Sequence, residues 1–435
     1  MSLTRSYSEV SVMAGLARKL LGTVILVLVV FFIVSGQRTV RFPDQNLEAA
    51  IREAIYKETG PILDFDLSWL SVFQASDRGI KDLAGIENCT SLTSVFLSGN
   101  SIRDLSLLAS LSILSVAYLD RNEIKDVSSL KGLTQLKELA LDYNDIDDIS
   151  ALEGLVFLEL LTLEGNPVSD LSPLRSLTRL RHLAVTCTAG CDLDPIHPLV
   201  HLESLLLESP SELDLTAVGR MQDLTRLALI STVIADLSPL RQLPLLKEFR
   251  LKDIEVESLV RVVDVNPDLE VLGLESMDVE DFTPLTELKE LRELHLVDVS
   301  FQDLGILFEF PELEELDIAG NDLTEIGILS ELKGLRSLNI SNNEIASIRA
   351  LDTLTELESL DLSGNPIEDL EPLWPLWRLQ TLIASSTQIT DIGVLLRLSS
   401  LRYVDLRDTP LDVSAGSAAG AVIERLRDRG VKVKL

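Results

Sequence analysis

The stretch ISALEGLVFLELLTLEGNPVSDLSPLRSLTRLRHLAV, residues 149–185, carries leucines that recur at a fixed step. Leu158 and Leu180 lie 22 residues apart, and the same step links the leucines at 70, 92, 114, 136, 158, 180, 202, 224 and 246. After one additional residue the series resumes at Leu269 and continues at 291, 313, 335, 357, 379 and 401. Sixteen positions in phase predict a stack of repeated units, each in contact with its neighbours.

The spacing within one unit predicts a short strand followed by a turn. In the second unit Val95 and Leu97 alternate with more polar positions, so one face of the strand is buried and the other exposed. Asn100 follows, where its amide can bond backbone groups of the turn. The order Leu92, Val95, Leu97, Asn100 is the leucine-rich-repeat signature. We therefore predict an α/β solenoid, a leucine-rich-repeat horseshoe with a parallel concave β-sheet and short 3-10 turns on the convex side.

A column of aspartates follows the strand in most units, at Asp104, Asp126, Asp148, Asp170, Asp192, Asp214, Asp236, Asp281, Asp303, Asp369 and Asp391. Each precedes a short apolar turn, and we expect its carboxylate to cap a one-turn helix by accepting free N–H groups. Five of these turns hold a proline three residues later, at Pro173, Pro195, Pro239, Pro284 and Pro372. Capping is favoured over calcium binding, because each aspartate stands alone without clustered oxygen ligands.

The composition narrows the class of protein. Hydrophobic residues make up 46% of the 435 residues and aromatic residues 5%, which predicts an aliphatic interior. The formal net charge of −31 argues against nucleic acid, whose binding relies on Lys and Arg. No set of nucleophile and base and no phosphate-binding glycine loop stands out. The sequence therefore predicts no enzyme, no cofactor and no metal site.

The N-terminal region differs from the rest. Residues 1–19 form a basic tail, and residues 20–37 carry no charge, with Arg18 and Lys19 directly before them. The apolar run Leu20–Gly36 has a length between that of a signal peptide and that of a membrane span. We predict a signal anchor or signal peptide at 20–37. The repeats would then lie outside the cytoplasm, anchored in the membrane or secreted after cleavage.

Both ends of the repeat array, predicted at 68–409, have sequences suited to closing it. Within 38–67, Leu47, Ala50, Ile51, Ala54 and Ile55 form one apolar helix face, which predicts an N-terminal helical cap. Asp44 is its expected N-cap. Within 410–435, AGAVIERLRDRG predicts a helix and VKVKL a final strand, together a C-terminal cap.

Over about residues 42–435 the chain resembles bacterial internalin-type leucine-rich-repeat proteins. The resemblance lies in the FPDQNLEAAIREAI helix, the entry ASDRGIKDLAGIENCTSLTSVFLSGN and the D-L-S-P-L repeats. It implies the same fold and recognition of a protein or peptide ligand on the concave face. No Ig-like domain or sorting motif follows the repeats in this sequence, so host-cell adhesion is not carried over. Regulatory subunits of protein phosphatase 1 share the repeat length, but the apolar segment argues against that cytoplasmic role.

Cysteine and histidine residues gather between 182 and 201, as His182, Cys187, Cys191, His197 and His201. On the repeat, the two cysteines fall on the turn that leaves the strand and the last two histidines on the return path, whereas zinc needs its four ligands at one point. In an exported chain a local disulfide between Cys187 and Cys191 is favoured. Unpaired surface thiols are the alternative.

The asparagine column is interrupted. Asparagine is present at 100, 122, 144 and 166, is replaced by Thr188, Pro210, Thr232, Ile254, Met277 and Val299, and returns at 321, 343 and 365 before Thr387 and Thr409. Repeat drift, with threonine as a partial substitute, is one interpretation. A central segment of altered curvature is the other.

Two functions are compatible with this pattern. One is an exported or membrane-tethered module that recognises a protein or peptide; the other is an envelope spacer or assembly scaffold without a dedicated ligand. A recognition face concentrates aromatic and Arg side chains. The candidate positions on the concave face are Phe96, Tyr118, Arg121, Tyr143, Arg226, Arg250, Lys252, His295, Tyr403 and Arg407. Phe96 and Tyr118 should form an aromatic strip with Tyr143 and contact the partner, while Arg226, Arg250 and Lys252 should select an acidic feature.

Overall fold

The computed structural model describes residues 38–188, 190–234, 236–255, 258–414 and 416–435. They belong to two compact units, divided between Leu139 and Ala140. The basic tail 1–19 and the predicted anchor or signal peptide at 20–37 lie outside the described residues. Within the described ranges, no helix is both long and apolar enough to span a membrane.

The first unit holds a helical cap and the first strands of the repeat array. Its elements are β1 (Thr39–Val40), α2 (Gln45–Ala54), β2 (Ile62–Leu63), α3 (Asp64–Leu67), β3 (Val72–Gln74), η1 (Ile86–Asn88), β4 (Ser94–Phe96), η2 (Ser106–Ser110), β5 (Val116–Tyr118) and η3 (Ser128–Gly132), where η marks a 3-10 helix. β1 and β2 pair antiparallel, whereas β3, β4 and β5 pair parallel in chain order. β6 (Glu138–Ala140) contains the division between the units.

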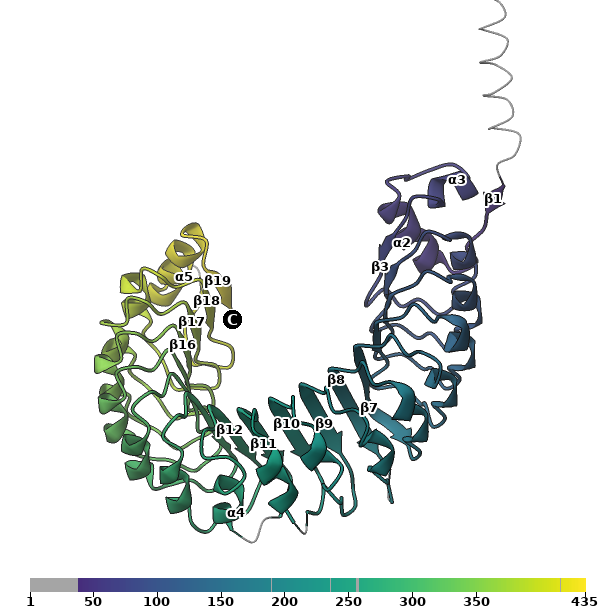
Figure 1. Cartoon of the computed structure of the whole chain (residues 1–435). Helices are drawn as coiled ribbons and strands as arrows, with labels where there is room; N and C mark the ends of the chain where they lie inside the picture. Colours follow the sequence, from purple (N-terminus) through teal and green to yellow (C-terminus); the bar gives the residue numbers. More distant parts are fainter. Residues whose placement is uncertain (1–37, 189, 235, 256–257, 415) are drawn as a thin grey trace, which may run out of the picture. The chain divides into compact units, whose positions relative to one another are not determined.

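The second unit alternates strands and single helical turns. Its strands are β7 (Leu160–Val168), β8 (His182–Cys187), β9 (Ser204–Glu208), β10 (Arg226–Ile230), β11 (Glu248–Lys252), β12 (Val271–Glu275), β13 (Glu293–Val297), β14 (Glu315–Asp317), β15 (Ser337–Asn339), β16 (Ser359–Asp361), β17 (Thr381–Ile383), β18 (Tyr403–Asp405) and β19 (Lys432–Lys434). Its helices are η4 (Ser150–Leu152), η5 (Ser172–Ser176), η6 (Asp194–Ile196), η7 (Val218–Arg220), η8 (Ser238–Gln242), α4 (Leu259–Val263), η9 (Thr283–Glu287), η10 (Leu304–Glu309), η11 (Gly327–Glu331), η12 (Arg349–Thr353), η13 (Glu371–Leu373), η14 (Gly393–Arg397) and α5 (Ala418–Asp428). From β7 to β19, each strand pairs parallel with the next (Figure 1).

The repeat phase read from the leucines sets where the strands begin. Each of the sixteen anchor leucines is buried, and a strand from the series β3 to β18 begins two residues after it, as β7 does after Leu158. The parallel register joins equivalent positions of neighbouring units, for example Phe96 with Tyr118 and Leu229 with Leu251. The predicted fold class, a leucine-rich-repeat solenoid with a parallel sheet and 3-10 turns, is confirmed.

The aspartate column caps the turns as predicted. In all eleven units the aspartate Oδ1 accepts a hydrogen bond from the backbone N–H two residues later, as Asp104 does from Ser106 at 2.8 Å. The prolines stand in the first turn of their 3-10 helices, where a missing N–H costs nothing. At the one-residue insertion the turn is the α-helix α4, in which Asp264 N donates to Val260 O. The additional residue allows this wider, i to i−4 turn.

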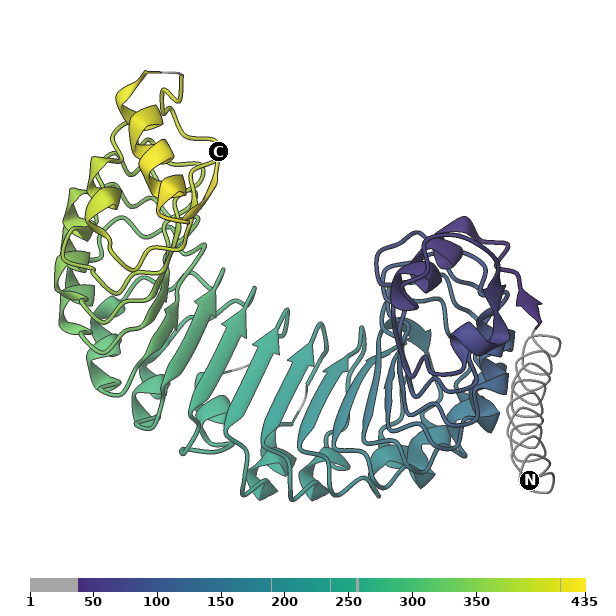
Figure 2. The same cartoon turned by 90° about the horizontal axis from the view of Figure 1, so that it is seen from above.

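The caps have the predicted elements. Leu47, Ala50, Ile51 and Ile55 of the helix stripe are buried. Asp44 Oδ1 accepts hydrogen bonds from the first turn of α2, and its Oδ2 accepts one from Lys81 N at 2.8 Å, so the same carboxylate joins the cap to the repeats. At the other end α5 follows β18, and β19 pairs with that strand (Figure 2).

The asparagine column coincides with a change in strand length. Where asparagine follows, β4, β5, β6, β14, β15 and β16 have 3 residues each. Where it is missing, the central strands β9 to β13 have 5 residues each. The correspondence holds for these strands only, because β7, which contains Asn166, spans 9 residues, and β17 and β18, which threonine follows, have 3 residues each.

Candidate functional site

Each strand presents alternate side chains to one face, which we call the open face of the sheet. In β4, for example, Val95 is buried whereas Ser94 and Phe96 are half-buried. The candidate residues on strands are Phe96 on β4, Tyr118 on β5, Arg226 on β10, Arg250 and Lys252 on β11, His295 on β13 and Tyr403 on β18. Arg121, Tyr143 and Arg407 lie just after strands, the first two with positive φ of 54° and 52°.

Phe96 and Tyr118 form an aromatic pair on the open face of the first unit. Their ring centroids are 5.1 Å apart at an interplanar angle of 75°, an edge-to-face contact. The Tyr118 hydroxyl donates to Glu138 Oε2 at 2.7 Å, and this bond, with burial, raises the pKa of Tyr118 to about 12. The phenol is therefore a protonated, fixed donor at neutral pH. Nearby, Arg121 Nε lies 3.2 Å from Asp120 Oδ2.

The basic band on β10 and β11 is largely paired with carboxylates. Arg250 Nε lies 2.6 Å from Glu248 Oε1, and Lys252 Nζ lies 3.2 Å from Glu275 Oε2. The exposed Arg226 makes no ion pair within the described part of the chain. Of the three predicted cations, Arg226 is thus the one that can contact a ligand without breaking an ion pair seen among the described residues.

His295 occupies the middle of the open face. Its Nε2 is buried, and among the described residues no hydrogen-bond partner reaches it. In register it lies between Gly273 and Asp317, and Arg250 leans over Gly273, where a Cβ would lie 3.1 Å from the arginine Cγ. Burial, followed by the charge of Arg250, lowers the pKa of His295. The imidazole is consequently neutral at pH 7.

Tyr403 and Arg407 bond the same carboxylate near the C-terminal cap. The exposed Arg407 contacts the buried Asp405 through several bonds, among them Nε to Oδ1 at 2.9 Å and Nη2 to Oδ2 at 2.7 Å. The Tyr403 hydroxyl donates to the same carboxylate at 3.2 Å. The hydrogen bond from Arg407 lowers the pKa of Asp405 despite its burial. These two candidates therefore stabilise the end of the stack.

The second unit contains a groove that sequence reasoning missed. Its volume is about 740 Å³, and it lies along the C-terminal ends of β7 to β11. The floor is one row of equivalent strand positions, formed by Glu164, Thr186, Glu208, Ile230 and Lys252. The rim consists of residues that come after the floor position in their repeats, at strand ends and in turns, namely Tyr143, Gly165, Asn166, Pro167, Cys187, Thr188, Pro210, Ser231 and Asp253. The 22-residue period places the floor residues, but the rim depends on turn conformations that the period does not encode.

An irregularity in β7 shapes one end of this groove. The register shifts between Leu163 and Val168, which marks a β-bulge. Gly165 has φ of 67°, and a Cβ there would lie 2.6 Å from the Tyr143 ring. Glycine is therefore needed both for the backbone conformation and for the close approach of the tyrosine.

Hydrogen bonds orient the polar side chains of the groove. The Tyr143 hydroxyl donates to Glu164 Oε1 at 2.5 Å, and the Thr186 hydroxyl donates to Glu208 Oε2 at 2.5 Å. The Glu164 bond, then burial and other carboxylates including Glu208, raise the pKa of Tyr143 to about 12. Both glutamates keep further lone pairs that can accept bonds from a ligand.

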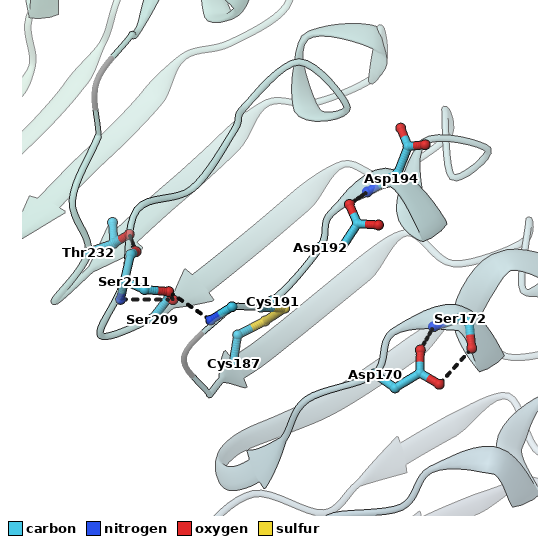
Figure 3. Close-up of a disulfide and its surroundings, with 10 residues drawn as sticks. Asp170, Ser172, Cys187, Cys191, Asp192, Asp194, Ser209, Ser211 and Thr232 are labelled. Carbon is cyan, nitrogen blue, oxygen red and sulfur yellow. Dashed lines mark hydrogen bonds between the residues drawn. A yellow bond between two sulfur atoms is a disulfide. The ribbon is translucent and has the colours of Figure 1, made fainter.

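Cys187 and Cys191 form a disulfide in the structure, with Cα atoms 5.7 Å apart (Figure 3). Cys187 is on the groove rim, and the adjacent Gly190 N donates to Ser211 Oγ at 3.2 Å. His197 Nδ1 contacts Asp194 O and His201 Nδ1 contacts Asp223 Oδ2. The part of the chain that the structure describes contains no group of three His, Cys, Asp or Glu residues suited to a metal ion.

Comparisons with known proteins agree with this architecture. Residues 311–353 and 333–373 match the family model "Leucine Rich repeats (2 copies)". Among solved structures, an internalin (inlF) of Listeria monocytogenes is 29% identical, covers 86% of this chain and 96% of its own, and has a TM-score of 0.46. The functional domain of InlJ from the same organism is 20% identical, covers 85% and 81%, and has a TM-score of 0.52.

A leucine-rich-repeat protein of Leptospira interrogans is 19% identical, covers 86% of this chain and 97% of its own, and has a TM-score of 0.48. A search of curated proteins returned no match. The matched residues 311–373 are leucine-rich repeats, and the chain has the fold of an internalin-type leucine-rich-repeat solenoid.

Proposed function

We propose that this protein is an exported or membrane-tethered recognition module that binds a protein or peptide partner on the open, concave face of its sheet. The observation that carries the proposal is the Phe96–Tyr118 pair, two aromatic rings in edge-to-face contact on neighbouring strands. Binding energy at protein interfaces concentrates in such aromatic anchors. No catalytic activity is proposed.

The surroundings of the pair suit an interface. Tyr118 is held by its bond to Glu138, so little side-chain freedom is lost when a partner docks. Arg121, beyond the end of β5, is exposed and adds a polar contact at the rim.

Affinity capture tests the proposal. The full chain, immobilised in a non-ionic detergent, is exposed to cell-envelope extract, and captured proteins are quantified by mass spectrometry. Replacing Phe96 and Tyr118 together by alanine should weaken retention of the main partner by about tenfold or more. A double mutant that retains the same partners equally well would place the binding surface elsewhere and favour the spacer function.

A matched variant distinguishes the loss of exposed aromatic area in general from the loss of the Phe96–Tyr118 pair. Phe308 and Trp374 are 55% and 58% exposed and lie at helical turns, away from the open face. Replacing both by alanine removes a similar aromatic area. Capture should then stay within about twofold of the unchanged chain, because these positions are peripheral to the proposed interface.

Export is proposed from the apolar sequence 20–37 and its basic flank. Cell fractionation followed by protease treatment of intact cells tests it. Residues 38–435 should be accessible to protease once the outer barrier of the cell is permeable. Protection of the repeats inside an intact cytoplasm would contradict the localisation without affecting the proposed binding face.

A further inference from the structure

The groove along β7 to β11 carries negative charge that its own residues do not balance. Its lining includes the carboxylates Glu164, Glu208 and Asp253 and a single cation, Lys252. That ammonium group already lies 3.2 Å from Glu275. The rest of the lining offers tyrosine, proline, isoleucine and small polar side chains. A ligand that complements this groove must therefore be cationic and must present an apolar surface to the rim.

The shape of the groove indicates an extended ligand. It runs across five consecutive strands, and the spacing of about 4.8 Å between strands makes it roughly 20 Å long. An extended chain can contact all five floor positions in turn. Tyr143, Pro167 and Pro210, which all come after the floor position in their repeats, contribute apolar surface of the kind that extended, proline-rich segments prefer.

The two glutamates set a spacing for the ligand. Glu164 on β7 and Glu208 on β9 are two strands apart, which corresponds to about 10 Å. In a polyproline II helix, residues three positions apart lie on the same side at about 9 Å. In a β-strand, residues on the same side lie about 7 or 13 Å apart. The polyproline II spacing matches the glutamates better.

We propose that this groove binds an extended segment of a protein partner in which two Lys or Arg side chains, three residues apart, contact Glu164 and Glu208. The proposal rests on the proposed recognition function and names the chemistry of one partner segment. Arginine suits both positions, because its guanidinium can reach the carboxylate lone pairs that the Tyr143 and Thr186 hydroxyls leave free.

Two labelled peptides of equal composition test the spacing. Gly-Arg-Pro-Pro-Arg-Gly carries its arginines three residues apart, and Gly-Arg-Arg-Pro-Pro-Gly carries them side by side. Binding to the full chain in non-ionic detergent is measured by fluorescence anisotropy at about 0.15 M salt, where unspecific attraction to an acidic protein is screened. The spaced peptide should bind at least about fivefold more tightly, because only it reaches both carboxylates.

Charge-removing variants test the site. Replacing Glu164 and Glu208 by glutamine keeps acceptors for Tyr143 and Thr186, and should weaken binding of the spaced peptide about tenfold. The control replaces Glu293 and Glu315, two carboxylates on the open faces of β13 and β14, by glutamine. This control variant removes the same amount of charge outside the groove, so binding of the spaced peptide should change less than about twofold. Thermal melting of both variants checks that the fold is kept.

Three results would overturn the proposal: equal binding of the two peptides, equal weakening by the two double variants, or no binding of the spaced peptide at millimolar concentration. Each of the first two would mean unspecific attraction to the acidic chain. None of these three results tests binding at Phe96 and Tyr118. If capture of a partner still depends on that pair, the recognition function stands and only the groove assignment fails.

Discussion

The repeats that carry a buried asparagine and the central repeats that lack it connect their turns by different means. In the first kind, Asn343 accepts hydrogen bonds from Asn321 N and Leu323 N at 2.9 Å each and donates to Ile318 O and Ile340 O at 3.0 Å each. One amide thus satisfies backbone groups of two consecutive units. In the central repeats, backbone bridges from Glu212 to Val233 and from Val233 to Glu255 link the turns instead.

The difference teaches that consecutive turns can be linked either by one buried side-chain amide or by the backbone itself. In the central strands β10 to β12, which lack the amide, the ladder has five residues. The groove of the second unit opens where the column changes from Asn166 to Thr188 and Pro210. The change of residue type in the column thus places variable side chains along the groove.

The largest expected effect comes from removing one asparagine. Asn343→Ala leaves Asn321 N, Leu323 N and Ile318 O without their side-chain partner, each with a cost of about 1–3 kcal/mol before relaxation, whereas Ile340 O keeps its bond from Asn365. We expect the free energy of unfolding to fall by roughly 3 kcal/mol or more, measured by urea denaturation. Asn339→Ala is the control, because that half-buried side chain in the same unit bonds Asp317 and Ser341. Equal losses in the two variants would refute the structural role of the column.

The disulfide lies in the central repeat in which Thr188 replaces the asparagine, and we predict that the bond stabilises the turn of that repeat. Replacing Cys187 and Cys191 by serine should lower the free energy of unfolding by about 2 kcal/mol, the chain-entropy value for a closed loop of this length. Urea denaturation of the variant measures the change. An unaltered midpoint would show that the link contributes nothing.

Alkylation without reductant checks the same bond chemically. In the native protein none of the three cysteines should react, since burial raises the pKa of the Cys89 thiol to about 12 and the other two are linked. After unfolding, Cys89 alone should be modified. Full alkylation of Cys187 and Cys191 would contradict the disulfide, and bound zinc would revive the metal site.

Threonine replaces asparagine in a central repeat, at Thr232, and in a repeat near the C-terminal end, at Thr387, and its effect on stability should be smaller. Thr387 Oγ1 donates to Ala384 O at 2.8 Å, and Thr232 Oγ1 donates to Ser211 O at 2.9 Å. Thr387→Val and Thr232→Val each remove one such bond while keeping the branched shape, so each should cost about 1 kcal/mol in urea denaturation. Thr355→Val, at an exposed position, should cost less. A loss as large as that of Asn343→Ala would remove the distinction between the two side chains.

The aspartate caps are common to both kinds of repeat, so acid sensitivity should not distinguish them. Bonds from Ser172 and Ser238 lower the pKa of Asp170 and Asp236. Because the folded pKa is below the unfolded one, the stabilisation is complete above about pH 4 and is lost as pH falls through the folded pKa. Replacing both aspartates by asparagine should slightly reduce the drop in melting temperature between pH 7 and pH 3. Asp268→Asn, outside the column, should leave that drop unchanged.

Much of the fold was predictable because each repeat carries the same local sequence pattern. The leucines at 22-residue spacing placed every strand from β3 to β18, and the aspartates placed the turns. α4 was missed because its extra residue changes the turn from 3-10 to α, a choice that depends on how Ser258 caps the helix. The predicted basic band lies on β10 and β11, and the sequence did not reveal that Glu248 and Glu275 pair with two of its members.

The sequence by itself determined which residues face inward, since a period of two along each strand and a period of 22 along the chain fix burial without knowledge of neighbours. Tertiary structure alone decided the groove between Tyr143 and Asp253, the unpartnered Nε2 of His295 and the pairing of Arg250. These features depend on turn dihedrals and side-chain rotamers, such as the positive φ of Gly165 that admits the Tyr143 ring. These dihedrals and rotamers are set by contacts between repeats 22 residues apart in the chain, so the sequence of a single repeat does not encode them.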